Sequence, residues 1–474
     1  MDSRTLRRTI AVGALGAVLL LSGCASTRNT LFVEIDDASR AGDFPRAVEL
    51  TEENQDRLYG NRDGVLFYLD TGMLHHYAGN FQVSTQRLSE AERLIEEYFT
   101  RSVRQAAASL LLNDNQLDYA GEDFEDIYLN VFNALSFISM GNPEGAFVEI
   151  RRISNKLNLL EDKYQGLAAG YNQSDEKDGG PAIQPGTSRF YNSALARYLS
   201  LVMYRAAGNY DGVRIDWQQM QEAFNRQSNL YTFPMPLTAE VMTPPADARL
   251  SVLAFTGRSP IKLASTLWIT TQDNRVTIAV AQEDERAGRV LQGYESFAFP
   301  GVEAGYRFKF ELPRMVLRGS EVTGVRVFAD GRLLGELGML EDMQQIALDT
   351  FQIREPIIFL KTVTRTIIKG VAAQRAGRAM QEAGAQSGST FGLVAGIVGS
   401  IAADVAVDAS EQADLRISRF FPAFAHVGEW DLPAGQYDIR VEYHSPRGLL
   451  FTEELGEVSV TPGEPNLVSS FFNN

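Results

Sequence analysis

The chain has 474 residues, of which 45% are hydrophobic and 10% aromatic, a composition typical of folded globular proteins. This length is enough for two or three domains with substantial cores. The formal charge of −16 argues against nucleic acid, or an anionic surface, as a partner held by the overall electrostatic field.

The first residues have the parts of an export signal. A basic head (Arg4, Arg7 and Arg8) precedes a short apolar segment over residues 10–21, which ends in Leu21-Ser22-Gly23-Cys24. The segment is too short to span about 30 Å of hydrocarbon as a stable helix. It therefore indicates a cleaved signal over residues 1–23.

The end of this segment resembles the bacterial lipobox, whose cysteine is acylated on its thiol and, after cleavage, on its new amine. Cys24 is the only cysteine in the chain and stands where the lipobox needs it. An ordinary signal peptide with a chance cysteine is the alternative. Each acyl methylene contributes about 0.8 kcal/mol of membrane affinity, so several chains anchor a protein durably. Ala25 stands where an inner-membrane retention signal carries Asp, which by this resemblance implies the outer membrane, facing the periplasm.

Cleavage before Cys24 changes the charge and the redox chemistry of the chain. It removes three arginines and one aspartate, so the formal charge moves from −16 to −18. With its one cysteine acylated, the mature protein has neither a disulfide nor a thiolate. Its stability in an oxidising periplasm is then expected to come from packing.

Residues 24–235 are predicted to form a helical region built on four similar turns. Each turn places a glycine before Asp or Asn, at Gly42, Gly79, Gly141 and Gly208. We expect each glycine to end a helix in the left-handed conformation and the next residue to cap the following helix. The glycines are 37, 62 and 67 residues apart, near one and two repeat lengths, so the region resembles a degenerate tetratricopeptide array. A generic antiparallel helical bundle is the alternative, and either one is a scaffold that presents surfaces.

Residues 236–474 are predicted to form a β-rich, sandwich-like domain. Short alternating runs indicate strands over 250–255, 262–270, 275–280, 306–312, 322–328 and 333–337, then over 426–430, 437–443, 457–460 and 466–471. Between the two sets, at about 340–412, we predict a helical, glycine-rich insertion with helices over 341–351 and 356–380. The predicted fold class is therefore α+β, with a tetratricopeptide-like helical region before the β-rich domain.

The insertion contains a stripe of small residues. Gly384, Gly388, Gly392, Gly396 and Ser400 recur every four residues, so on a helix they would let two backbones approach closely. One interpretation is a hairpin that inserts into a membrane or oligomerises, which would make the protein a membrane-remodelling or export accessory. The strongly apolar part covers only about residues 391–403, too few to span a bilayer. Tight packing of a soluble hairpin is therefore the preferred interpretation.

The sequence contains one pattern that resembles a calcium loop. Four carboxylates have the required offsets: Asp114, Asp118, Glu122 and Glu125. The position that needs glycine is Tyr119, so a solvated helix junction is the preferred interpretation.

No other pattern indicates a metal site or a catalytic site. His75 and His76 are adjacent and would point about 100° apart on a helix, which is unsuitable for chelation. The H-E-x-x-H and G-x-S-x-G motifs and the Walker glycine loop are absent. We therefore expect no metal, no cofactor and no enzymatic activity.

Several stretches resemble a family of uncharacterised bacterial lipoproteins that carry tetratricopeptide repeats. They are Leu112-Asn113-Asp114, Tyr119-Ala120-Gly121-Glu122-Asp123-Phe124-Glu125, and Ala413-Asp414-Leu415-Arg416 leading to Leu432-Pro433-Ala434-Gly435-Gln436-Tyr437. Genes of that family often lie beside lipoprotein activators of penicillin-binding proteins, which implies a role in the cell envelope. The family has no assigned catalytic residues.

Together these features predict a non-enzymatic outer-membrane lipoprotein that acts as a periplasmic interaction scaffold in cell-envelope biogenesis or maintenance. Its expected partners are a periplasmic or outer-membrane protein and, through the acyl anchor on Cys24, the membrane itself. Nucleic acid is not an expected partner.

The lipobox gives a first testable prediction. Cys24→Ser removes the thiol that is acylated, so labelling with radioactive palmitate should be lost and the protein should leave the outer-membrane fraction. Equal labelling of the variant and the wild type would contradict the lipoprotein assignment.

Overall fold

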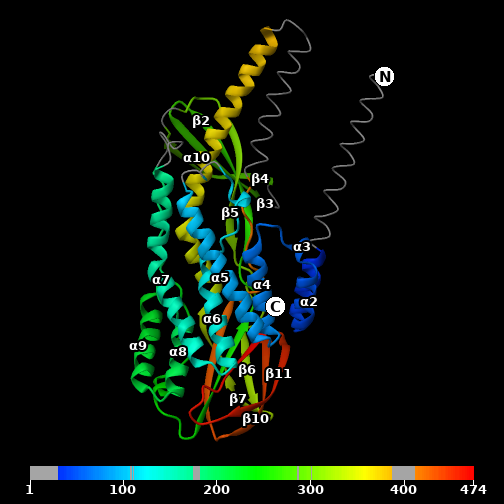
Figure 1. Ribbon diagram of the computed structural model, residues 1–474, viewed down its shortest axis with the longest axis vertical. Helices are drawn as coiled ribbons and strands as arrows, with labels where there is room; N and C mark the ends of the chain where they lie inside the picture. The colour runs from blue at the N-terminus through cyan, green and yellow to red at the C-terminus, as the bar shows by residue number, and fades with distance from the viewer. Residues whose placement is uncertain are drawn as a thin grey trace, which may run out of the picture.

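The structure is a computed structural model that describes residues 30–106, 109, 112–173, 182–284, 288–299, 302–386 and 412–474. The export signal with Cys24 lies outside these ranges, as do Gly388, Gly392, Gly396 and Ser400 of the predicted stripe. The described chain is a mixed α and β protein in which a helical region precedes three four-stranded sheets (Figure 1).

The helical region consists mainly of helices joined by short turns. Helical residues 30–40 are followed by α2 (Phe44–Glu53), α3 (Gln55–Leu58), α4 (Gly64–Tyr77), α5 (Phe81–Arg104), α6 (Asp123–Ser139), α7 (Pro143–Asn172), α8 (Ala194–Ala206) and α9 (Tyr210–Arg226). The α4–α5, α6–α7 and α8–α9 pairs each pack closely across one turn. In α6, every residue from the first turn to Ser136 is buried, so this helix lies inside the region.

The four predicted glycine turns share one backbone geometry. Gly42, Gly79, Gly141 and Gly208 have φ values of +76°, +75°, +67° and +68°. In the second turn, Gly79 N–H donates to the His76 carbonyl (3.0 Å) and Asn80 N–H to the His75 carbonyl (2.8 Å), and the other three turns repeat this pair of hydrogen bonds. This arrangement is the Schellman ending, which satisfies the last carbonyls of a helix.

The residue after each glycine caps the next helix in three of the four turns. The side chains of Asp43, Asn142 and Asn209 accept a hydrogen bond from the backbone N–H three residues later. Asn80 makes no such side-chain bond. These turns establish helical hairpins, while a tetratricopeptide array remains a prediction.

The strands form three sheets. The first has the order β12-β1-β9-β8, with β12 (Leu467–Phe472), β1 (Ala248–Thr256), β9 (Phe424–Leu432) and β8 (Gly338–Asp342). The second has the order β11-β10-β6-β7, with β11 (Gly448–Val460), β10 (Gly435–Ser445), β6 (Gly324–Ala329) and β7 (Arg332–Glu336). The third has the order β4-β3-β2-β5, with β4 (Gly288–Ala298), β3 (Arg275–Asp284), β2 (Ile261–Gln272) and β5 (Arg307–Val316).

Strand β1 lies at the centre of the molecule and is buried along its whole length. Leu250 and Val252 face the second sheet, so the first two sheets pack as a sandwich. Leu253 and Phe255 belong instead to a core shared with the helices. The helical region, the first sheet and the second sheet are thus successive layers, and the helical and strand regions have a common core.

Helix α10 (Met343–Gln386) corrects the predicted insertion. The expected break between two helices is absent, and Pro356 lies inside one continuous helix. Glu341, predicted to begin a helix, belongs to β8. A proline inside a helix removes one backbone hydrogen bond. Burial of Phe351, Ile357 and Val363 in three different apolar clusters fixes the helix along its length and offsets that loss.

The end of α10, which carries Gly384, projects beyond the third sheet (Figure 1). Among the described residues, no helix is both long enough and apolar enough to cross a membrane.

The turn geometry predicts opposite effects of two matched substitutions. Gly79→Ala places a side chain at φ +75° and should lower the free energy of unfolding by about 1–2 kcal/mol, although no atom would obstruct the new Cβ. Gly166→Ala, in the helical interior of α7 and equally unobstructed, should raise it by up to about 1 kcal/mol. Urea titrations of both variants measure the difference. Equal effects would show that the left-handed conformation is not what requires glycine at position 79.

Candidate functional site

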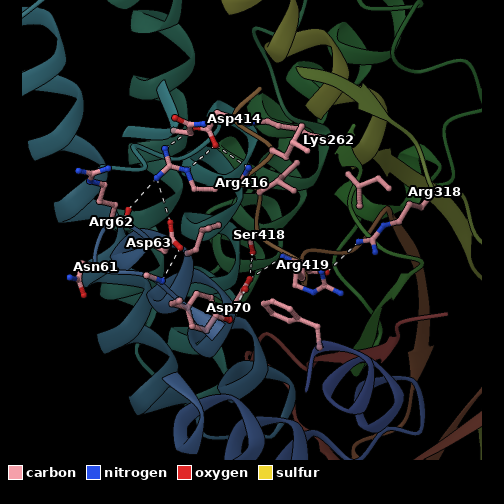
Figure 2. Close-up of a pocket in the computed structure, with 18 residues that line it drawn as sticks. Asn61, Arg62, Asp63, Asp70, Lys262, Arg318, Asp414, Arg416, Ser418 and Arg419 are labelled. Carbon is pink, nitrogen blue, oxygen red and sulfur yellow. Dashed lines mark hydrogen bonds and ion pairs between the residues drawn. The ribbon is translucent and has the colours of Figure 1, made fainter. Parts of the chain in front are cut away.

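A cleft of about 800 Å³ lies where the helical region meets the strand region (Figure 2). We call it the junction cleft. Its walls come from residues 59–63 after α3, from the start of β2, and from residues 414–419, which lead into β9. The chain therefore builds this cleft from segments that are more than 300 residues apart.

The guanidinium group of Arg416 holds one wall in place. Its Nε and Nη2 donate to the two carboxylate oxygens of Asp414, both at 2.8 Å, and Nη1 lies 3.4 Å from Asp63 Oδ1. It also donates to the carbonyl oxygens of Asp114 (2.9 Å) and Leu117 (3.0 Å). Charge-assisted, two-pronged hydrogen bonds of this kind are strong and directional. Arg416 therefore fixes the path of residues 414–419 against the helical region.

A second polar cluster surrounds the N-terminus of α6. Glu122 pairs with Lys262 of β2 and with Arg354 of α10, the latter at 3.0 Å. Glu125 accepts hydrogen bonds from Tyr119 Oη (2.7 Å) and from the Glu122 backbone N–H (2.8 Å). Burial, reinforced by the charge of Glu122, raises the pKa of Glu125 to about 7.

These contacts correct the prediction of a solvated helix junction. Glu122 and Glu125 are 2% and 0% exposed, and the cations that neutralise Glu122 come from distant elements. Asp114 pairs with Lys361 of α10, and Asp118 with Arg101 at 2.8 Å. The carboxylates with calcium-loop spacing are thus engaged by cations or by hydrogen bonds.

Three of the stretches that carry the family resemblance, residues 112–114, 119–125 and 413–416, meet at this junction. Asn113 Nδ2 donates to the Gln412 carbonyl at 2.9 Å, and the Asp114 carbonyl accepts from Arg416. The Arg416 guanidinium also lies 5.3 Å from the centre of the Tyr119 ring. Their proximity could not be inferred from spacing, because about 290 residues separate them.

Three guanidinium groups gather at the other end of the junction cleft: Arg258, Arg318 and Arg419. We call them the arginine cluster. Arg258 and Arg419 donate to the same oxygen, Asp36 Oδ2, at 3.1 and 2.8 Å. Arg318 donates to the carbonyl oxygens of Ser259 (2.6 Å) and Arg419 (3.4 Å). No sequence motif marks these residues, and sequence reasoning missed them.

A second cavity, of about 710 Å³, is lined by α5, α6 and α7, and we call it the helical groove. Its floor is a buried ion network around Lys156, whose Nζ lies 2.7 Å from Asp126 Oδ1, 2.7 Å from Asn130 Oδ1 and 2.8 Å from Glu92 Oε1. Burial acts to lower the pKa of Lys156, whereas the charges of Asp126 and Glu92 act to raise it. The effect of the two carboxylates is larger, so the pKa is raised. The ion pairs therefore hold the three helices at a fixed spacing.

The remaining residues singled out by the sequence lie elsewhere. None of the four turn glycines lines the junction cleft or the helical groove. His75 faces Glu52 (3.3 Å), whereas His76 contacts Ser136 Oγ (2.7 Å), so the two rings have different partners. Within the described ranges, no three His, Cys, Asp or Glu side chains could together hold a metal ion.

Comparison with known proteins assigns no family. No family model matches the sequence, and no curated protein or solved structure gives a significant match. The class that the fold defines is a mixed α and β protein whose helical region precedes its sheets.

The raised pKa of Glu125 predicts a pH-dependent stability. The pKa of Glu125 is about 7 in the folded protein and about 4.5 in the unfolded chain. The stabilisation that the protonated carboxyl contributes is therefore complete below pH 4.5 and is lost as the pH rises to 7. The free energy of unfolding of the wild type, minus that of Glu125→Gln, should fall by about 1–3 kcal/mol over this interval.

Urea titrations at several pH values measure this difference. Glu161→Gln, at an exposed position of α7, is the control and should follow the wild type. A constant difference between wild type and Glu125→Gln from pH 4.5 to 7 would contradict the assignment.

Proposed function

We propose that this protein is a non-enzymatic, lipid-anchored scaffold of the outer membrane, facing the periplasm, and that its helical groove binds a segment of a protein partner. The observation that carries this proposal is the combination, in one groove, of a buried ion network and an exposed leucine, Leu159, with further apolar side chains beside it. The export signal and lipobox of the sequence support the location.

The apolar wall provides the contact surface. Leu159 of α7 is 60% exposed, and Phe99 and Leu160 line the groove beside it. Exposed apolar side chains bordered by charges are typical of protein interaction sites. A partner that inserts an apolar side chain here would bury Leu159 without reorganising the helices.

Polar groups at the groove edge favour a particular kind of partner. The Arg152 side chain is 45% exposed, and its Nη1 contacts Glu92 (2.7 Å) and Glu149 (3.2 Å). Its outward-facing part can take a carboxylate of a partner, since a guanidinium has five donors. We therefore expect a segment with an apolar side chain next to an acidic one.

The position of the proposed anchor is compatible with this role. Five residues separate Cys24 from Thr30, the first described residue, so these two residues can be at most about 22 Å apart. An acyl anchor at Cys24 would therefore keep the scaffold close to the membrane surface.

Site-specific photocrosslinking in living cells tests the groove. A photoreactive amino acid at position 159 should give an adduct of defined mass. The same amino acid at position 333, an equally exposed leucine (52%) in β7, should give none. Leu159→Asp should lower the yield of a crosslink from position 155, also in the groove, about tenfold or more. It should change the free energy of unfolding by no more than about 0.5 kcal/mol, because the site is on the surface.

Two results would count against the groove as the binding site. One is an adduct of equal yield from positions 159 and 333. The other is an unchanged yield from position 155 in the Leu159→Asp variant.

A further inference from the structure

We propose that the arginine cluster at the end of the junction cleft binds an oxyanion, a phosphate or carboxylate group carried by a ligand that occupies the cleft. This site is separate from the helical groove and does not depend on the function proposed for it.

The charges at this end of the cleft do not balance. The three guanidinium groups of Arg258, Arg318 and Arg419 face one directly bonded carboxylate, that of Asp36, which leaves two positive charges. Both contacts to Asp36 use the same carboxylate oxygen. Arg318 bonds only to backbone carbonyls within the described part of the chain.

Neighbouring charges do not remove this excess. Arg40 is paired with Asp37 at 2.6 Å and adds no net charge. Asp70 accepts hydrogen bonds from Ser418 Oγ (2.7 Å), the Arg419 backbone N–H (3.0 Å) and Tyr59 Oη (2.9 Å), and burial raises its pKa. Even with Asp70 counted as ionised, the described side chains of this group retain one positive charge.

The cluster is only partly shielded from water, since the Arg419 side chain is 32% exposed and that of Arg258 18%. Partial burial makes an uncompensated charge costly, and a counter-ion lowers that cost. The Nε atoms of Arg258 and Arg419 are buried and have no hydrogen-bond partner among the described residues, so that part of the chain does not satisfy the cluster fully. Burial, with the charges of Arg258 and Arg419, lowers the pKa of Arg318 to about 9. Arg318 still carries its proton at neutral pH, and a bound anion would relieve the repulsion.

The cluster is accessible from the cleft. Arg318 and Arg419 both line it and lie on the same side (Figure 2). The Arg419 guanidinium is held 4.3 Å from the centre of the Phe32 ring, which fixes its position. Lys262 also lines the cleft, but its charge is taken by Glu122. Arg62, which follows α3, also lines the cleft but lies on the opposite side from Arg318 (Figure 2). The clustered cations of the cleft are therefore those of Arg318 and Arg419.

The size and lining of the cleft indicate a ligand that is larger than a free inorganic ion. Its volume of about 800 Å³ is far larger than one phosphate group, and apolar side chains of Phe32, Ile261 and Ile417 line it beside the arginines. Guanidinium groups bind phosphate and carboxylate oxygens in pairs. The expected ligand thus carries its anionic group at one end and an apolar part next to it.

A footprinting experiment on the unaltered full chain tests the site. Phenylglyoxal modifies accessible arginines, and mass spectrometry measures the rate at each residue. Inorganic phosphate should slow modification of Arg318 and Arg419 at least threefold, relative to sodium chloride of equal ionic strength. The exposed Arg314 of β5 is the internal control and should react equally in both salts. Equal rates at Arg318 in the two salts would overturn the proposal.

A variant series gives an independent readout. The thermal midpoint of the wild type should rise saturably with phosphate, and Arg318→Gln should weaken the apparent affinity about tenfold or more, as expected for a lost charge-assisted contact. Arg314→Gln should behave as the wild type, and Arg318→Lys should keep part of the response. The same saturable response in wild type and Arg318→Gln would overturn the proposal. Acetate in place of phosphate distinguishes a carboxylate ligand from a phosphate ligand, and tighter binding of either supports the site.

Discussion

The guanidinium group of Arg416 is the contact on which the arrangement of the two regions depends. It joins two carboxylates and two backbone carbonyls from four separate positions in the chain. This set of largely buried contacts is favourable only when all the partners of Arg416 are in place. A partner without its contact would be a polar group removed from water and unsatisfied. The path that it imposes on residues 414–419 also sets the positions of Ser418 and Arg419, and so the shape of the junction cleft (Figure 2).

The first residues of α6 connect the two cavities. Glu122 pairs with Lys262 at the junction cleft, and the adjacent Asp123 pairs with Lys163 in the helical groove at 2.9 Å. Neutralising partners thus hold this helix end from both sides. Two consecutive residues at the start of α6 are therefore paired with one lysine from each cavity.

Features set by local chemistry could be predicted from the sequence, whereas those set by distant partners could not. A glycine that ends a helix favours the left-handed conformation, and all four turns adopt it. Alternating runs likewise placed most strands. The predicted helix break before Pro356 was wrong, because tertiary packing of α10 outweighs the local cost of a proline inside a helix.

Glu341 is an example of a residue whose position is set by distant partners. Its sequence context is typical of a helix start, yet its side chain accepts hydrogen bonds from Tyr128, Ser193 and Tyr231. Those partners lie 110 to 213 residues away in the chain. No pattern within one segment reports such a contact, and the same holds for the arginine cluster and the ion pairs of the junction cleft.

The pairing of β1 with β12 determines when the molecule can finish folding. β12 is parallel to β1, and Phe471 stacks on Phe255 of β1 with ring centres 5.4 Å apart. The Phe471 ring also contacts Tyr77 of α4 in a tilted arrangement, with ring centres 4.6 Å apart. A chain emerging from a ribosome or a translocon makes its helices first, yet their apolar face is not completely covered until residues 467–472 arrive. Contacts over such sequence separations form slowly. The unfinished chain therefore keeps part of its apolar helical face exposed until the last strand has paired with β1.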